Sequence, residues 1–94
     1  MQFTRRLREP IRNGEITTSI RIWQSPRVKV GHRYRMEDGH IEVEAMLEIG
    51  LADITQRLAR ESGFGSVPEL LKVAKHGPGM RVYLVRFHFI PALP

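Results

Sequence analysis

Ser19 and Arg21 are the two residues in this sequence whose types and spacing could best carry chemistry. They lie two apart in a stretch rich in β-branched residues, and residues two apart in a β-strand project from the same face. A hydroxyl beside a guanidinium can hydrogen-bond a phosphate or the edge of a base, with arginine supplying a planar fork of donors. A second interpretation stays open, in which Arg21 forms an ordinary ion pair with an acidic residue such as Glu48.

The basic side chains are concentrated in the first part of the chain. The 94 residues carry fifteen Lys and Arg against ten Asp and Glu, a formal net charge of +5. Residues 1–36 hold nine basic and two acidic side chains, whereas residues 37–94 hold six basic and eight acidic. Because cations that contact a polyanion release its condensed counterions, this asymmetry favours a nucleic acid or nucleotide partner. The candidate surface cations are Arg5, Arg6, Arg12, Lys29 and Arg33.

Several classes of protein are excluded by composition. There is no cysteine, which rules out disulfides, thiolate catalysis and cysteine-based zinc sites. The four histidines, His32, His40, His76 and His88, are too widely spaced to suggest a metal site, and we expect no cofactor. No apolar run approaches the roughly 18 residues that span a bilayer, and the first residues do not form an apolar leader. We therefore expect a cytoplasmic, single-domain protein over residues 1–94 with no membrane partner; the sequence does not indicate its oligomeric state.

The first part of the chain predicts a helix followed by two strands. A helix over 4–13 is indicated by Leu7 and Ile11, four apart on one face, with Gly14 placed to end it. A strand over 16–23 follows. Residues 28–31 then lead into a second short strand through Tyr34 and Met36, which precedes a tight turn at Asp38-Gly39. In the strand over 16–23, one face is expected to carry Thr18, Ile20 and Ile22, and the other Thr17, Ser19, Arg21 and Trp23.

The remainder predicts a strand, two helices and a last strand. The strand over 40–49 alternates strongly, and the apolar residues that we expect on one face are Ile41, Val43, Ala45, Leu47 and Ile49. A helix over 51–62 ends at Gly63, and another starts at the capping box 66–69 and runs to about Lys75 or His76. The strand over 81–90 is apolar on both faces and therefore central. Together these elements predict an α+β fold, a small mixed or antiparallel β-barrel with two or three short helices.

The stretch 55–74 also resembles a DNA-binding helix-turn-helix, with Ala59 and Gly63 spaced so that two helices can cross closely. Pro68 interrupts the first turn of the second helix, and Glu69 and Lys72 stand where that helix should pack on the first. We therefore interpret the two helices as a cap on the barrel, with DNA recognition as an alternative.

Residues 11–21 resemble the opening of ASCH domains, a PUA-like superfamily whose signature is Gly-x-Lys-x-x-Thr-x-Arg after a short helix. The corresponding residues here are Gly14, Ile16, Ser19 and Arg21. The similarity continues through Val28 to His32, which looks like the family's Val-Gly-Asp turn, the helix with Ala59 to Phe64, and the closing strand Val82 to Phe87. The resemblance covers nearly the whole chain and implies a PUA-like barrel that binds RNA or a nucleotide.

Some members of that family are acetylcytidine amidohydrolases that use a lysine, a threonine and a glutamate. By resemblance, the threonine corresponds to Ser19 and the glutamate to Glu61, or to Ser62 if the match shifts by one residue. The lysine position is Ile16, which cannot accept the hydroxyl proton, so the activation of Ser19 as a nucleophile is broken. Lys29 and Lys75 are alternative cations, and His32 and His88 are alternative bases.

We therefore expect a non-enzymatic module that binds RNA or a nucleotide, in a cleft between the Ser19 and Arg21 strand and the helical segment near Glu61 and Lys75. Trp23 and Tyr34 are candidates for stacking on a base, although a lone tryptophan is readily explained as core. Hydrolysis of a modified nucleoside or of RNA by Ser19 and Glu61 is the alternative function.

Overall fold

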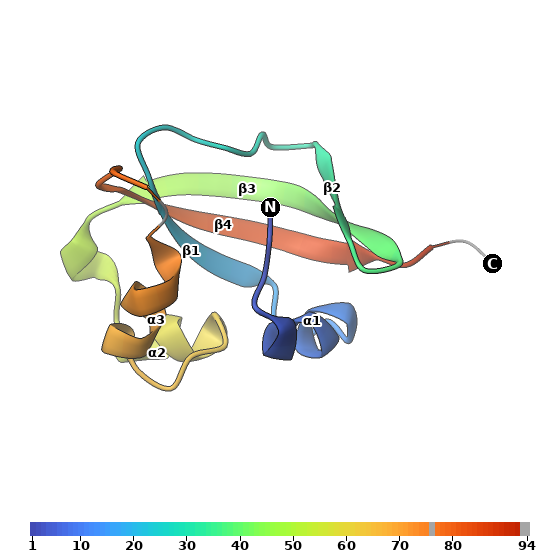
Figure 1. Ribbon diagram of the computed structural model, residues 1–94, viewed down its shortest axis with the longest axis horizontal. Helices are drawn as coiled ribbons and strands as arrows, with labels where there is room; N and C mark the ends of the chain where they lie inside the picture. The colour runs from blue at the N-terminus through green and yellow to red at the C-terminus, as the bar shows by residue number, and fades with distance from the viewer. Residues whose placement is uncertain (76, 93–94) are drawn as a thin grey trace.

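A computed structural model describes residues 1–75 and 77–92 of the chain. In chain order the elements are α1 (Arg5–Arg12), β1 (Thr18–Trp23), β2 (Arg33–Met36), β3 (Gly39–Ile49), the 3₁₀ helix η1 (Leu51–Asp53), α2 (Gln56–Glu61), α3 (Val67–Ala74) and β4 (Arg81–Ile90). The four strands form one antiparallel sheet in the order β1-β4-β3-β2, and this sheet curls into a half-barrel (Figure 1). The α+β class, the antiparallel sheet and the three short helices are as predicted.

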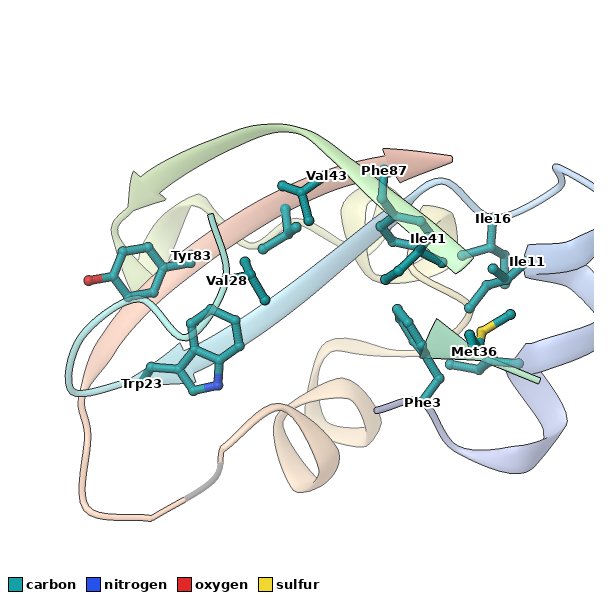
Figure 2. Packing of buried hydrophobic residues seen from close by; sticks show 12 residues of the cluster. Phe3, Ile11, Ile16, Trp23, Val28, Met36, Ile41, Val43, Tyr83 and Phe87 are labelled. Atoms are coloured by element: carbon teal, nitrogen blue, oxygen red, sulfur yellow. The ribbon is translucent and has the colours of Figure 1, made fainter. Parts of the chain in front are cut away.

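Strand β4 lies inside the sheet, as its apolar pattern predicted. It pairs with β1 on one side and with the longer β3 on the other. Tyr83, Val85 and Phe87 face a large core that also receives side chains from the N-terminal segment, α1 and β2 (Figure 2). Val82 and Leu84 face a smaller core beneath α2 and α3. The sheet is therefore covered on both faces over this part of its length.

Several elements begin and end where the local sequence predicts. Helix α1 ends at Arg12 with Asn13 as its C-cap, and Gly14 follows with a left-handed φ of +78°, a conformation that glycine adopts without steric cost. Helix α3 starts after Ser66, whose side chain accepts a hydrogen bond from the backbone N–H of Glu69 at 3.3 Å. The predicted last turn at His76 lies outside the described residues.

The helix predicted over 51–62 is wrong as a single element. The chain forms η1, then passes through Ile54 in an extended conformation, and α2 starts only after Thr55. The Thr55 hydroxyl accepts a hydrogen bond from the N–H of Leu58 at 3.1 Å and so caps a new helix. The break lets Ile54 bury its side chain in the smaller core, which tertiary packing favours over an unbroken helix.

A β-bulge at Glu44 overturns the predicted arrangement of β3. Val43 pairs with Phe87 and Ala45 with Arg86, so Glu44 is an extra residue without a partner in β4. A bulge shifts the alternation by one position. Ile41 and Val43 therefore point into the larger core, while Ile49, expected on the same face, packs against the smaller one.

The β2–β3 hairpin has its turn one residue earlier than the Asp-Gly pair suggests. Met36 pairs with Gly39, so the two loop residues are Glu37 and Asp38, and Glu37 has the positive φ of +54°. Gly39 is instead a buried strand residue against β4. A Cβ there would overlap the carbonyl oxygen of Ile90 and lie 2.6 Å from the Phe89 ring. The glycine is thus required by close approach rather than by turn geometry.

Gly39→Ala should lower the free energy of unfolding by about 2 kcal/mol, because the added methyl group forces β3 and β4 apart. Urea denaturation with equal m-values for the two proteins would measure the loss. Gly50→Ala is the matched control, since its Cβ would meet only the Asp53 carboxylate at 3.2 Å. Equal stability of the two variants would contradict the crowding at Gly39.

Candidate functional site around Arg21

Ser19 and Arg21 both line one pocket, which we call the Arg21 pocket, whereas Glu61 and Lys75, predicted on its opposite side, are not among its lining residues. The pocket has a volume of about 160 Å³ and lies between the N-terminal segment, β1 and the α2–α3 pair. Because β1 is an edge strand, side chains from both of its faces reach the pocket, Ser19 and Arg21 from one and Thr18 and Ile20 from the other. The opposite walls include Phe3, Phe64 and Ala74.

The Arg21 guanidinium is buried without a carboxylate. Its side chain is 8% exposed, and Nε donates to Ser19 Oγ at 2.9 Å while Nη2 donates to the carbonyl oxygen of Gln2 at 2.5 Å. The guanidinium carbon also lies 4.9 Å from the centre of the Phe3 ring. Among the residues that the structure describes, no acidic side chain forms an ion pair with it.

The interpretation of Arg21 as the partner of Glu48 is therefore wrong. Glu48 accepts two hydrogen bonds from Arg81, at 2.6 and 3.2 Å, on the exposed surface. That bidentate hydrogen bonding holds the pKa of Glu48 below its ordinary value. The register explains the pairing, because Arg81 and Tyr83 are neighbours of Glu48 across the β3–β4 ladder, whereas Arg21 lies one strand further away.

Burial lowers the pKa of Arg21 to about 10. The group therefore stays protonated at neutral pH, but its charge is disfavoured by roughly 3 kcal/mol relative to water. The two hydrogen-bond acceptors of the guanidinium are neutral, so they pair some of its N–H groups but do not compensate its charge. A buried charge of this kind is costly to folding, and it is stabilised when an anion binds beside it.

Ser19 and Glu61 are not brought together. Ser19 is buried beside Arg21, and its hydroxyl oxygen accepts from Arg21 Nε. Glu61 is exposed on α2, does not line the pocket, and accepts a hydrogen bond from Arg57 at 3.1 Å. The neighbouring Ser62 lines the pocket instead, with its hydroxyl donating to the carbonyl of Leu58 at 2.9 Å. Ile16, which occupies the lysine position of the motif, is a buried lining residue.

Both aromatic candidates for base stacking have structural roles. Trp23 is 3% exposed and packs against Tyr83 with ring centroids 5.8 Å apart, so the core interpretation is confirmed (Figure 2). The Tyr34 hydroxyl accepts a hydrogen bond from the backbone N–H of Lys29 at 2.8 Å. The aromatic rings that do line the Arg21 pocket, Phe3 and Phe64, were missed because the sequence places them outside the strand that carries the motif.

One predicted cation, Arg6, approaches the pocket, since its guanidinium carbon lies 5.1 Å from the centre of the ring of the lining residue Phe64. Four others do not contribute to the lining. Arg12 pairs with Asp38 at 2.6 Å and Arg33 with Glu42 at 3.0 Å. Lys29 is exposed in the loop before β2, and Lys75 follows α3 and lines a different pocket. None of these four lines the Arg21 pocket.

Arg21 is shared with a second, adjoining pocket. This one has a volume of about 320 Å³, and its lining includes Gln2, Arg21, Trp23 and Arg27. No carboxylate lines it among the described residues. Sequence reasoning missed Arg27, although the basic character of residues 1–36 was a signal for it. Arg21 therefore stands between a mainly apolar cavity and a basic one.

The histidines expected as substitute bases lie elsewhere. His88 contacts the carboxylates of Glu42 and Glu44 on the sheet, and His32 is exposed before β2. Within residues 1–75 and 77–92, no three acidic or histidine side chains are grouped so as to hold a metal ion. None of the helices in this part of the chain is long and apolar enough to cross a membrane.

Comparisons of the chain with protein-family models, with curated proteins and with solved structures found no significant match. Function is therefore inferred from the sequence and geometry of this chain itself.

Arg21→Met should raise the free energy of unfolding by about 1 kcal/mol in the absence of ligand, because it replaces an uncompensated buried charge with an apolar side chain of similar length. Urea denaturation at neutral pH would measure the change. Arg57→Met, at an exposed position, should leave stability nearly unchanged. A clear loss of stability in Arg21→Met would assign the guanidinium a structural role in holding the N-terminal segment.

Proposed function

We propose that this protein binds RNA or a nucleotide without catalysing a reaction, with Arg21 as the anion-binding residue. The observation that carries the proposal is the buried guanidinium at the boundary of two pockets, with no carboxylate partner in the part of the chain that the structure describes. An uncompensated buried charge lowers the free energy of unfolding, so its presence in a folded protein suggests that it binds a ligand. Arginine also presents the donor geometry that fits a phosphate.

The shape of the site favours a ligand that joins a flat apolar group to an anion. An apolar cavity of about 150 Å³ can hold a benzene molecule, so the pocket of about 160 Å³ is large enough for a single planar ring. Phe3 and Phe64 supply aromatic surface, and Ser19 supplies a hydroxyl close to the guanidinium. The adjoining pocket with Arg27 offers room for a phosphate. A nucleotide combines these two features.

The resemblance to ASCH domains agrees with this location, and we propose a PUA-like ASCH fold for the half-barrel. The motif glycine ends α1, and the motif serine and arginine lie on the adjacent β1 inside the pocket. The segments that resemble the family also follow its order along the sequence, which supports this proposal. The departure at Ile16 places an apolar side chain where a lysine would otherwise face the ligand.

Hydrolysis by Ser19 and Glu61 remains the alternative, and the geometry favours it less. Among the described residues, the pocket lining contains no histidine, lysine or carboxylate that would take the proton of the Ser19 hydroxyl. Arg21 stays protonated at neutral pH and serves poorly as a base. DNA recognition by 55–74 is also less favoured, because α2 and α3 bury Ala59, Leu70 and Ala74 against the sheet.

Single-stranded RNA of about ten nucleotides should bind with an affinity that falls steeply between low and physiological salt, measured by fluorescence anisotropy. Arg21→Gln should weaken binding roughly thirtyfold, the loss of one buried, charge-assisted hydrogen-bonding group worth about 2 kcal/mol. It should also reduce the magnitude of the salt slope by about 0.7, the value for one phosphate contact on a single strand.

Arg57→Gln removes the same charge from the exposed surface of α2 and should change the affinity less than twofold. Val73→Phe, which adds a ring to the wall of the Arg21 pocket, should weaken binding without altering charge. The absence of measurable binding to RNA and to nucleoside monophosphates at low salt would remove the proposal, as would equal effects of Arg21→Gln and Arg57→Gln.

The hydrolytic alternative has its own test. Incubation with acetylcytidine should leave the compound unchanged, as followed by liquid chromatography, because the Ser19 hydroxyl lacks a base. Consumption of acetylcytidine that disappears in Ser19→Ala would show instead that the protein is an enzyme with Ser19 as its nucleophile.

A further inference from the structure

A second site is indicated by the exposed apolar side chains, which are not scattered evenly. Four large hydrophobic residues in the described part of the chain are more than half exposed: Val30, Leu47, Leu51 and Met80. Leu51 and Met80 line one pocket together, and Leu47 lies two residues before the lining residue Ile49 on the same side of β3. Exposed hydrophobic residues that gather in one place mark a binding site more often than single ones do.

The pocket lies where the end of α3, η1 and the loop before β4 meet the sheet. Its volume is about 420 Å³, within the range of small-molecule sites in proteins. Ile22 and Val82, both part of the smaller core, form its floor, and Leu71 lies on one wall. Met80 is 82% exposed at the mouth, and the flexible methionine side chain can close over ligands of different shape.

Within residues 1–75 and 77–92, one positive charge in the lining of this pocket has no carboxylate partner. Arg81 and Glu48 both line it, but they neutralise one another through their bidentate ion pair. Lys75 also lines it, and within the described residues no carboxylate forms an ion pair with its ammonium group. The backbone of Lys75 is fixed beside Ile22 by a β-bridge, which holds the base of the side chain at the pocket.

We propose that this pocket binds a small amphipathic anion, a medium-chain carboxylate whose chain lies on Ile22, Leu71 and Val82 and whose head group pairs with Lys75. The apolar floor accounts for the chain, and the unpaired ammonium accounts for the carboxylate. The site has no lining residue in common with the Arg21 pocket, so it is independent of the proposed binding of RNA or nucleotides.

The four methionines allow the site to be located directly by NMR of the methionine methyl groups. Titration with octanoate should shift the Met80 signal. The signals of Met1, which lines the pocket with Arg21 and Arg27, and of Met36, in the larger core, should not shift. Octanol, which lacks the charge, should shift the same Met80 signal but bind with a lower affinity. A shift of Met1 without Met80 would place the ligand at Arg21 and overturn the proposal.

Lys75→Met should weaken octanoate about fivefold, as expected for one partly exposed ion pair, and leave octanol unchanged. Lys72→Met is the matched control, since Lys72 is exposed on α3 and does not line the pocket. Leu51→Glu should weaken octanoate binding at least tenfold by placing a carboxylate at the mouth, whereas Val30→Glu, at a similarly exposed position that does not line the pocket, should have no effect.

Equal losses in Lys75→Met and Lys72→Met would show that octanoate responds to net charge rather than to this site. Sedimentation analysis distinguishes a further occupant: self-association that Leu51→Glu abolishes, with no octanoate shift at Met80, would assign the pocket to a second copy of the chain and overturn the proposal.

Discussion

The structure depends on the pairing of β4 with strands on both sides. β4 is the last strand of the chain, and its antiparallel ladders with β1 and β3 unite the beginning, the middle and the end of the sequence. Since β4 is apolar on both faces, it supplies side chains to both cores, Val85 and Phe87 to the larger and Val82 to the smaller. The helices pack against the two cores to which β4 contributes these side chains.

The Arg21 pocket lies beside β1 because β1 is at the edge of that sheet. An inner strand has neighbours on both sides, whereas β1 is paired with β4 on one side and, among the described residues, has a single bridge on the other, from Ile22 to Lys75. Space therefore remains between its free edge and the surrounding segments. The side chains of Ser19 and Arg21 project from this edge strand and line the space. The Arg21 guanidinium can therefore be buried and still lie beside a cavity.

Local patterns predicted the elements well where a few neighbouring residues determine the structure. The helix ending at Gly14, the cap at Ser66 and the central strand β4 follow from backbone preferences and from alternation that is visible in the sequence. The break after η1 was missed because it depends on burial of Ile54 against the sheet. The shared face of Ser19 and Arg21 was likewise predictable, since β1 has no irregularity.

The site was predicted less completely than the fold, because a pocket is assembled from distant segments. Nothing local to Phe3 or Phe64 indicates that they approach β1, and the resemblance that suggested Glu61 differs by one residue from the lining residue Ser62. Which cations pair with carboxylates also depends on the sheet register. The charge asymmetry of residues 1–36 is thus largely balanced in space for Arg12 and Arg33, but not for Arg21.

The bulge at Glu44 has a consequence for the shape of the whole sheet. A residue inserted in one strand lengthens that strand relative to its neighbour, bends it and increases its twist. Val43 and Ala45 on either side of Glu44 pair with consecutive residues of β4, so a chain without Glu44 would keep every other side chain on its present face. The extra residue therefore contributes curvature to the sheet rather than a side chain to its cores.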